Sequence, residues 1–475
     1  MATLPQMAND RGVYLSAGLA HADADRLAAE APVPAGALDL DWAALQPWLA
    51  ARAEALQRLP AKRIRGPAIR QAAEAILDGG RHAREVFLGR HAAEIYDRLT
   101  VGRRRLLRLG ELAYAAAAAF PGLVPSRADI ERERQLPQMH QDGLQIDQGI
   151  FLAHVLSDPE RGLHLLHAMR RPTPAALARL DSFRTTGRAE LPSMTLERRG
   201  DQGRITFHHQ AWLNAEDDEY QEALETLVDL ALLDDGIRVG VLRGAPMTKP
   251  AYAGRRIFGA GINLTQLYEG RISLLRFMLE RETGPLAKIY RGLSPEQPNP
   301  GAAEDGIEKP FVAAVDGFAI GGHCQMLLVL DRVIAQRGAY FNLPARREGI
   351  IPGVANLRLP RFVGERASRQ GIFFNRDFPA DSPEGRLLCD EVVDGEDAME
   401  DAIRRAVSDL QSAGTTSLVG NRRALRVGAE PIDLFRRYMA TYAREQAYCM
   451  YSPALIDNLV RNWTERKRRV HRDGP

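Results

Sequence analysis

The stretch KPFVAAVDGFAIGGHCQMLLVLD, residues 309–331, is the part of the chain that decides the fold. Its run Phe311–Val315 predicts a buried strand, Asp316-Gly317 predicts a turn, and Gly321-Gly322 predicts the start of a helix that continues to Leu330. Glycines at the start of a helix let a ligand atom approach bare backbone N–H groups, at the positive end of the helix dipole. This stretch therefore predicts a backbone site for an anion that develops during a reaction.

A second glycine turn, FGAGINL at residues 258–264, also follows a predicted strand and offers its own backbone N–H groups. Either turn by itself is more typical of a tight turn than of an anion site. Two donors from two different strand ends can form an oxyanion hole, and losing one such donor typically costs about 3 to 4 kcal/mol of transition-state stabilisation. Together, the two turns predict an enzyme that stabilises an oxyanion.

Hydrophobic spacing divides the chain into three parts. Residues 1–190 show apolar positions at three- and four-residue spacing, which predicts an N-terminal helical domain that serves packing and oligomer contacts. In residues 191–395, β-type runs alternate with helices, among them a helix from Ala215 to Leu233 and the buried strand VGVLRG. This alternation favours an α/β core with parallel strands. Residues 396–475 return to helices.

The composition of the 475 residues is that of an ordinary globular protein, with 45% hydrophobic and 26% charged residues. The 63 basic and 61 acidic residues leave a net charge of +2, which gives no reason to expect nucleic acid or an anionic membrane as a partner. Three cysteines without CxxC spacing and an N-terminus without a signal-peptide pattern predict a cytoplasmic protein. The sequence contains no metal-ligand pattern, dinucleotide fingerprint or P-loop.

The order of these motifs resembles the crotonase (enoyl-CoA hydratase/isomerase) superfamily over roughly residues 191–469. The resemblance implies a ββα spiral core whose C-terminal helices exchange between subunits, in a homo-trimer or homo-hexamer. It also implies that the backbone N–H groups of Ile262 and Gly322 hold the thioester oxygen of an acyl-CoA.

Two positions depart from the pattern of the hydratases in this superfamily, which carry glutamates where this chain has Gln325 and Ala345. Neither residue can exchange a proton as a carboxylate does, so addition of water to an enoyl-CoA is not expected. Glu348 could replace the missing carboxylate, although a solvated charge is the commoner role of such a residue. His323 is more typical of a packed residue than of a base.

Over nearly its whole length, including the GGHCQ variant, the chain is similar to a cofactor-free dioxygenase branch of the superfamily that serves glycopeptide-antibiotic biosynthesis. This resemblance implies that O2 oxidises an arylacetyl-CoA and that no metal, flavin or haem takes part. It implies that Glu216 and Arg281 contact the hydroxyls of the substrate ring, with Gln325 as a neutral donor and acceptor. Without the resemblance, Glu216 would be a charge on the first turn of a helix, and Arg281 one side of a surface ion pair.

The same resemblance places the other parts of the substrate. Ile350 and Ile351, in the turn GIIPG, are expected to line an apolar O2 pocket together with Ile262. The residues expected to contact the CoA arm are Gln210 to Trp212, Lys249, Tyr252, Arg255, Ala260, Gly261 and Asn263, with the basic run 466–469 as a further phosphate contact.

Two alternatives to a dioxygenase stay open at this point. The first is a crotonase-type hydratase, isomerase or thioesterase with a relocated base. The second is a catalytically silent scaffold whose helical half binds a partner, which the missing glutamates favour and the intact pair of glycine turns disfavours.

Overall fold

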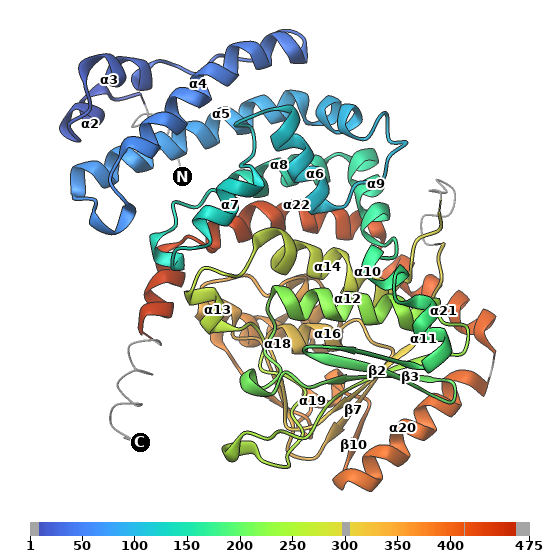
Figure 1. Cartoon of the computed structure of the whole chain (residues 1–475). Coiled ribbons are helices and arrows are strands. Elements are labelled where there is room, and N and C mark those ends of the chain that lie inside the picture. Colours follow the sequence, from blue (N-terminus) through green and yellow to red (C-terminus); the bar gives the residue numbers. More distant parts are fainter. Residues whose placement is uncertain (1–8, 297–304, 413, 462–475) are drawn as a thin grey trace. The chain divides into compact units, whose positions relative to one another are not determined.

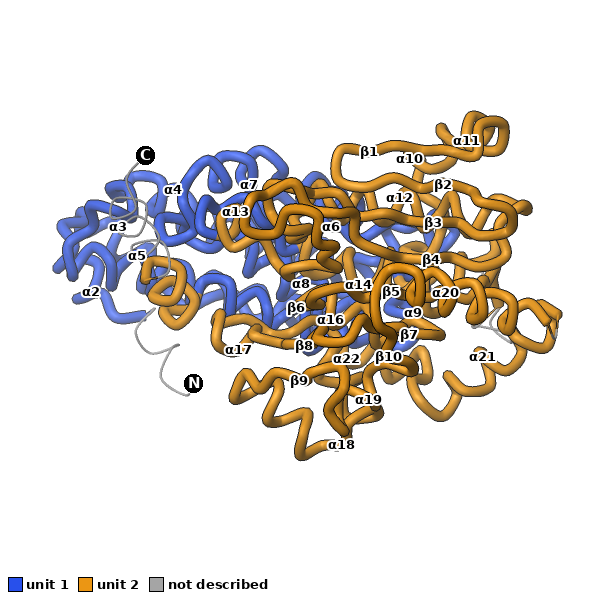
Figure 2. Tube along the Cα trace, turned by 90° about the horizontal axis from the view of Figure 1, so that it is seen from below, with its two compact units in different colours: residues 1–165, 268–274, 439–451 blue, residues 166–267, 275–438, 452–475 orange. Residues whose placement is uncertain are grey.

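The computed structural model describes residues 9–296, 305–412 and 414–461 (Figure 1). The chain divides into two compact units (Figure 2). Unit 1 comprises residues 1–165, 268–274 and 439–451, and unit 2 comprises residues 166–267, 275–438 and 452–475. Segments that are far apart in the sequence therefore share a unit, whereas the division at residues 190 and 395 stays a prediction.

Unit 1 is helical, as the spacing of its apolar residues predicts. Its helices are α2 (Arg11–Ser16), α3 (His21–Ala28), α4 (Leu38–Arg58), α5 (Pro67–Leu99), α6 (Leu109–Ala119), α7 (Arg127–Glu133) and α8 (Gln145–Ser157), with the 3-10 turns η1 (Lys62–Ile64) and η2 (Gln138–His140). Gly149 in α8 allows a close approach to residues 439–451, because a Cβ atom there would stand 2.5 Å from Cβ of Ala447 and 2.7 Å from O of Ala443. The helices α9 (Pro159–Met169) and α22 (Ile432–Cys449) have several residues in each unit.

Unit 2 is built around a seven-stranded sheet with the order β1-β2-β3-β4-β5-β7-β10. The pairs β1–β2 and β2–β3 are antiparallel, and β3, β4, β5, β7 and β10 are parallel to one another. The strands are β1 (Arg188–Leu191), β2 (Met194–Arg199), β3 (Gln202–Phe207), β4 (Val239–Gly244), β5 (Phe311–Val315), β7 (Arg332–Gln336) and β10 (Glu391–Val393).

Successive side chains of β5 point to opposite faces of this sheet, and helices cover both faces. Phe311, Ala313 and Val315 are buried in a core that includes the apolar side of α12 (Asp218–Leu233). Val312 and Ala314 are buried in a second core with the apolar side of α20 (Gly395–Ser412). Because successive side chains of a strand point to opposite faces, a strand buried on both faces must be apolar throughout, as this one is. Figure 1 shows α12 and α20 on opposite sides of the strands.

A second, smaller sheet consists of β6 (Phe318–Ile320), β8 (Tyr340–Asn342) and β9 (Phe378–Pro379), which alternate along the chain with the last strands of the first sheet. The π-helix η5 (Leu274–Glu280) begins on the last residue of the unit 1 segment. The other short helical elements of unit 2 are α10 (Pro174–Leu177), α11 (Leu180–Thr186), η3 (Gln210–Trp212), η4 (Pro250–Tyr252), α13 (Leu264–Tyr268), α14 (Arg281–Thr283), α15 (Pro285–Arg291), α16 (Gly322–Leu327), α17 (Ala345–Glu348) and α19 (Gly385–Leu388). The longer ones are α18 (Ala355–Phe374) and α21 (Thr415–Ala429).

Two predicted helix bounds are wrong by about one turn. The helix α16 ends at Leu327 and not at Leu330, because the chain must turn there to begin β7 at Arg332. The helix α12 begins at Asp218 and not at Ala215, because the side chain of Asp217 accepts a hydrogen bond from the backbone N of Tyr220 and so caps the helix.

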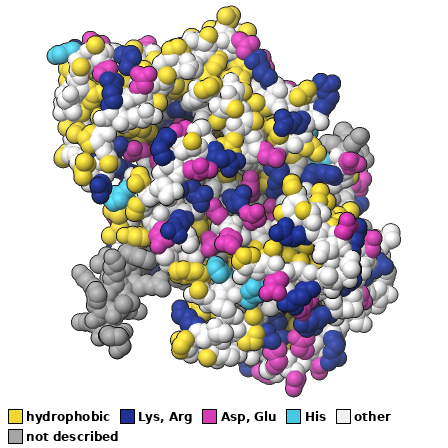
Figure 3. All heavy atoms as spheres, viewed as in Figure 1, with side chains coloured by type: hydrophobic (Ala, Val, Ile, Leu, Met, Phe, Trp, Pro, Cys, Tyr) yellow, Lys and Arg dark blue, Asp and Glu magenta, His cyan; other side chains and the backbone are white. Residues whose placement is uncertain are grey.

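The surface agrees with the nearly balanced charge of the sequence. Basic and acidic side chains are interspersed over the face shown in Figure 3. Within the described ranges, every helix is too short or too polar to cross a membrane.

Three guanidinium groups, two of them buried, surround one carboxylate in unit 2. Glu430 is fully buried and accepts hydrogen bonds from Arg358, Arg361 and Arg291. Burial by itself raises the pKa of Glu430, but these cations outweigh burial and lower the pKa to about 2. The carboxylate is therefore ionised at neutral pH, and its charge is neutralised within the core.

This cluster predicts a pH-dependent contribution to stability. A folded pKa of about 2, below the usual 4.5, means that Glu430 stabilises the fold above pH 4.5 and loses this effect as the pH falls toward 2. The shift corresponds to about 3 kcal/mol. In urea unfolding, Glu430→Gln should lower the unfolding free energy at pH 7 by about 3 to 5 kcal/mol, because it leaves buried cations uncompensated. Equal stabilities of wild type and variant at pH 7 would contradict this account.

Candidate active site

The two glycine turns of the sequence meet in unit 2. Gly259 forms a parallel bridge with Ala319, in which Gly259 N donates to Phe318 O at 3.2 Å and Ile320 N donates to Gly259 O at 2.9 Å. Two residues further along each segment, a Cβ atom at Gly321 would stand 3.2 Å from Cα of Gly261 and 3.9 Å from N of Ile262. Both Gly261 and Gly321 have positive φ, of 79° and 54°, so glycine is required on both sides of this contact.

The backbone N–H groups of Ile262 and Gly322 are the two donors that the sequence predicted for an oxyanion. Within the described residues, neither group has a hydrogen-bond acceptor. Ile262 is held in place by Glu216, whose N donates to Gly261 O at 2.7 Å and whose O accepts from Asn263 N at 2.7 Å. Gly322 opens the helix α16. Two buried donors without acceptors, one of them at a helix start, are the kind of groups that an oxyanion site requires, and their role as such a site stays a prediction.

Arg281 joins the predicted polar residues into one network. Its Nε donates to Glu216 Oε2 at 3.0 Å, and its Nη2 donates to Glu216 Oε1 at 3.2 Å and to Gly322 O at 2.5 Å. Its Nη1 donates to Gln325 Oε1 at 2.9 Å and to Glu282 Oε1 at 2.6 Å. All five N–H bonds of the guanidinium therefore have acceptors. Arg281 is 3% exposed and Glu216 is fully buried, so the interpretation of either residue as a surface charge is wrong.

The sequence analysis missed Glu282, which is 1% exposed and contacts the network through Arg281. In the sequence, Glu282 belongs to the run LERE, which is typical of a solvated helix face. The seven-residue π-helix η5 ends at Glu280, directly before Arg281 and Glu282. Because a π-helix shifts the direction of the residues that follow, the 3.6-residue periodicity of the sequence could not reveal that both charges are buried.

His323 is a packed side chain, as expected. It is fully buried against the rings of Phe207, Tyr220 and Phe258, and its Nε2 lies 3.0 Å from the hydroxyl oxygen of Tyr220. Burial lowers the pKa of His323 to about 4, so the ring is neutral at pH 7. A Cβ atom on Gly259 would overlap this ring, which explains the absence of a side chain at that position.

The turn GIIPG lies against the network. A Cβ atom on Gly353 would stand 2.5 Å from Gln325 Oε1, and Tyr438 Oη donates to Gly353 O at 2.5 Å. Ile350 and Ile351, in the same turn, are half-buried. Their role in an O2 pocket stays a prediction.

Glu348 is not the fully solvated charge that the sequence predicted. It is half-buried at the last position of α17, on the same side of this single turn as the buried Ala345 three residues before it. Burial raises the pKa of Glu348 to about 7.

Ala260, Gly261 and Asn263, three of the residues predicted to contact CoA, belong to the glycine turn FGAGINL. Tyr252 and Ala260 pack on the small apolar cluster of Met247, Ile257 and Phe318. The side chain of Gln210 bridges to the loop after β4, where its Nε2 donates to Pro246 O at 3.0 Å and its Oε1 accepts from Thr248 N at 2.9 Å. Lys249 is exposed.

The side chain of Asn263 is used by the fold. Its Oδ1 accepts from Gln266 N in α13, and its Nδ2 donates to Asp217, the N-cap residue of α12. The basic run 466–469 lies outside the described residues.

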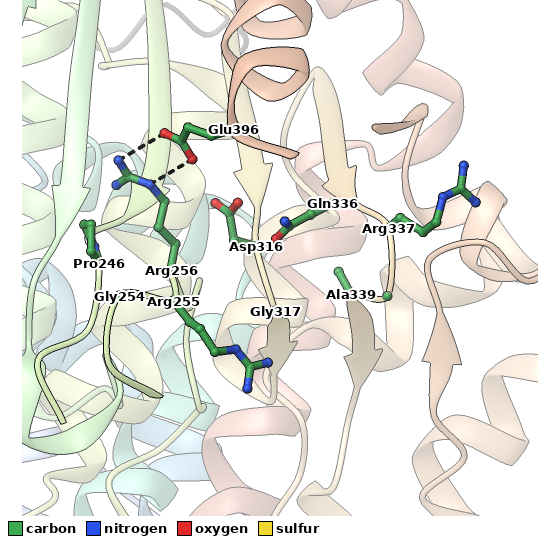
Figure 4. Close-up of a pocket in the computed structure, with 11 residues that line it drawn as sticks. Pro246, Gly254, Arg255, Arg256, Asp316, Gly317, Gln336, Arg337, Ala339 and Glu396 are labelled. Atoms are coloured by element: carbon green, nitrogen blue, oxygen red, sulfur yellow. Dashed lines mark hydrogen bonds and ion pairs between the residues drawn. The ribbon is translucent and has the colours of Figure 1, made fainter. Parts of the chain in front are cut away.

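A cavity of about 650 Å³ opens at the carboxyl ends of β4, β5 and β7 (Figure 4). Its lining includes residues 254–256, which closely follow Tyr252 in the sequence. In Figure 4, Arg256 turns toward Glu396, whereas Arg255 and Arg337 point away from it. Arg337 is paired with Asp394. Arg255 lies near the ring of Tyr252, and it has no carboxylate partner among the described residues. The lining residues are Pro246, Gly254, Arg255, Arg256, Asp316, Gly317, Gln336, Arg337, Gly338, Ala339 and Glu396.

Comparisons with known proteins identify the family of the chain. The enoyl-CoA hydratase/isomerase family matches residues 303–439. The chain is 49% identical over 409 residues to the (3,5-dihydroxyphenyl)acetyl-CoA 1,2-dioxygenase of Amycolatopsis orientalis, a match that covers 85% of this chain and 91% of that protein. It is 28% identical over 243 residues to the short-chain-enoyl-CoA hydratase of Clostridium acetobutylicum, covering 51% of this chain and 84% of the hydratase.

Among solved structures, an enoyl-CoA hydratase/isomerase from Xanthobacter autotrophicus Py2 matches with a TM-score of 0.47 and 22% identity, over 59% of this chain and 99% of that chain. The family match and the described elements confirm the predicted fold class, a crotonase-like core with an N-terminal helical region and C-terminal helices. In the part of the chain that the structure describes, no group of three or more His, Cys, Asp or Glu residues could hold a metal ion.

The close packing at Gly322 predicts a specific sensitivity to a methyl group. A Cβ atom there would overlap Glu216 Oε2 and stand 2.8 Å from Arg281 Nη2. We expect Gly322→Ala to force the ion pair apart and to lower the unfolding free energy by about 1 to 3 kcal/mol. The matched control is Gly428→Ala, also at a helical glycine but with open space around the Cβ position, which should be neutral or slightly stabilising in the same urea unfolding experiment. Equal effects of the two substitutions would contradict the packing described for Gly322.

Proposed function

The chain belongs to the enoyl-CoA hydratase/isomerase family, in the branch of the (3,5-dihydroxyphenyl)acetyl-CoA 1,2-dioxygenase, and on this basis we propose that it oxidises (3,5-dihydroxyphenyl)acetyl-CoA with O2. The products are (3,5-dihydroxyphenyl)glyoxylate and CoA, which together contain all atoms of the thioester and of O2. The observation that carries the proposal is the pair of acceptor-free N–H groups of Ile262 and Gly322, which would bind the thioester oxygen.

The oxyanion site supports the first step. Removal of a proton from the carbon between the ring and the thioester leaves a carbanion whose charge spreads onto the thioester oxygen. Two N–H groups aimed at that oxygen lower the cost of the charge, and a water-excluded site strengthens their effect. The carbanion can itself donate an electron to O2, so the proposal needs no metal, flavin or haem.

The side chains around the oxyanion site support the departure from hydratase chemistry. Gln325 lies one turn after Gly322 on α16 and accepts a hydrogen bond from Arg281, so it is a neutral group held in one orientation. An amide cannot deliver a proton to a substrate carbon or activate water as a carboxylate does. Ile262, Ile350 and Ile351 are proposed to line the space for O2.

Glu216 and Arg281 are proposed to bind the ring hydroxyls of the substrate, but the two residues have different roles. Each carboxylate oxygen of Glu216 accepts from Arg281 and retains lone pairs for a phenolic O–H. Arg281 has no spare N–H bond, so a direct contact with the substrate requires the exchange of an existing acceptor. Glu216 is therefore the primary contact in this proposal, and Arg281 orients it.

The other end of the substrate is proposed to lie along the glycine turns toward Arg255. Tyr252, Ala260 and Gly261 would contact the CoA arm, with Gln210 and Lys249 on the neighbouring loops. Arg255, at the cavity of Figure 4, is a cation that can pair with a CoA phosphate. The homo-trimeric or homo-hexameric assembly and the cytoplasmic location stay predictions.

An oxygen-electrode experiment tests the proposed reaction. We expect the enzyme, stripped of metal by chelation and free of flavin, to consume one O2 for each CoA released from (3,5-dihydroxyphenyl)acetyl-CoA. No O2 uptake would refute the dioxygenase. Release of CoA at an undiminished rate without O2 would instead favour a thioesterase, the second candidate, and failure to bind any acyl-CoA in calorimetry would favour a silent scaffold.

Arg281→Lys tests the role of the guanidinium fork. Lysine keeps the charge but has three donors for five acceptors, so Glu216 and Gln325 should lose their fixed orientation. Loss of a charge-assisted hydrogen bond costs about 1.5 to 3 kcal/mol. We expect kcat/KM for the arylacetyl-CoA to fall roughly 10- to 150-fold. Arg276→Lys, on the preceding π-helix with a half-exposed side chain, is the matched control and should retain wild-type kinetics. Wild-type kinetics in Arg281→Lys would refute the assignment.

A further inference from the structure

Glu282 is a buried carboxylate with one oxygen that accepts a hydrogen bond and one that has no hydrogen-bond donor among the described residues. Its Oε1 accepts a hydrogen bond from Arg281 Nη1 at 2.6 Å. Its Oε2 has no hydrogen-bond donor among the described residues, and Arg358 Nη1 lies 3.6 Å away from it. Leaving a buried carboxylate oxygen without a donor is costly, so a residue of this kind needs an explanation beyond packing.

The position of Glu282 relative to the oxyanion site follows from two contacts. A methyl group on Gly353 would overlap Glu282 Oε1 and stand 2.5 Å from Gln325 Oε1, so these two oxygens lie within about 5 Å of each other. One guanidinium connects Glu282 to the oxyanion helix, because Arg281 Nη2 donates to Gly322 O at 2.5 Å while Nη1 donates to Glu282. Glu282 therefore lies next to the side chains that contact the start of α16, and its Oε2 is the oxygen of this carboxylate that lies 3.6 Å from Arg358 Nη1 and has no hydrogen-bond donor among the described residues.

We propose that Glu282 is the base that removes the α-proton of the acyl-CoA thioester, an inference that rests on the function proposed above. The α-carbon is two bonds from the thioester oxygen, so a base that reaches it must stand beside the groups that hold that oxygen. In this step the C–H bond breaks and its electron pair moves into the thioester as the enolate. The proton moves to Oε2 of Glu282, which becomes a neutral carboxylic acid.

The other candidates for this role fit less well. Both oxygens of Glu216 accept from Arg281, through Nε and Nη2, so neither carboxylate oxygen of Glu216 lacks a donor. The ring of His323 is enclosed by aromatic side chains. Glu348 is a half-buried carboxyl, but no hydrogen bond or ion pair connects its side chain to Arg281, Gln325 or Gly322.

Exchange of the α-protons with solvent isolates this step from the reaction with O2. Wild type, Glu282→Gln and Glu348→Gln are incubated with the arylacetyl-CoA in D2O without O2, and deuterium at the α-carbon is followed by mass spectrometry. A general base contributes about 10²- to 10⁴-fold. We therefore expect exchange in Glu282→Gln to fall at least 100-fold, while the Kd for the thioester, measured by calorimetry, changes less than about threefold.

Glu348→Gln should exchange at the wild-type rate. Glu365→Gln, at an exposed glutamate of α18, is the matched control for the substitution itself. A wild-type exchange rate in Glu282→Gln, or loss of exchange in Glu348→Gln alone, overturns the proposal. Loss of exchange together with loss of thioester binding would also overturn it, because Glu282 would then serve only to position Arg281.

A second variant decides the question if Glu282→Gln does not fold. Glu282→Asp keeps the charge beside Arg281 and Arg358 but withdraws the carboxylate by one methylene. Since a misplacement of about 1 Å can cost 100-fold in rate, exchange should fall at least tenfold. An unchanged rate would overturn the proposal. O2 uptake by the wild-type enzyme is measured in parallel, so that failure of the dioxygenase reaction is distinguished from failure of Glu282 as its base.

Discussion

The guanidinium of Arg281 is the group on which the candidate site depends. It is almost completely buried, and its five N–H bonds end on four partners: both oxygens of Glu216, the carbonyl of Gly322, the amide of Gln325 and one oxygen of Glu282. A buried cation is tolerable only when its donors are satisfied, and here the partners that satisfy it are the residues that surround the oxyanion hole. The requirement for a stable buried charge and the requirement for a rigid site are therefore met by the same contacts.

This network continues into the structural core of unit 2. Arg358 lies 3.6 Å from Glu282 and also donates to Glu430, which is held by Arg291 and Arg361 as well. Cations and carboxylates alternate along this line, so each charge has an opposite charge as its neighbour. Such an arrangement resists small displacements, because moving one member leaves a buried charge uncompensated. Positions in the site are thus fixed by electrostatics as well as by packing.

Glycine has a different role, because it removes atoms where chain segments must touch. A side chain at Gly322 would strike Glu216, one at Gly259 would strike His323, and one at Gly353 would strike Gln325 and Glu282. The absence of Cβ atoms lets the backbone of three segments approach the Arg281 network closely. These glycines explain how a site with several charged side chains can also hold backbone N–H groups at its centre.

Much of the fold was predictable from local patterns, because the spacing of apolar residues indicates which side of a strand or helix is buried. The apolar run Phe311–Val315 and the predicted strand Val239–Gly244, which is apolar except for Arg243, correspond to β5 and β4 at their observed bounds. Helix ends were less predictable, since Leu327 ends α16 only because the chain must turn toward β7. The pair of glycine turns indicated the family before any contact was known, and the family resemblance named Glu216, Arg281 and Gln325 as partners.

The sequence by itself determined the strands, the two glycine turns and the replacement of the hydratase glutamates by Gln325 and Ala345, since each is a property of neighbouring residues. Only the tertiary structure decided how the charges are used. It brings Glu216 to Arg281 across 65 residues and Gln325 to Arg281 across 44, and it buries Glu282 with one oxygen that has no hydrogen-bond donor among the described residues. The physical reason is that a charged residue has the same local pattern whether it meets water or a partner, and which of the two it meets is settled by packing between distant segments.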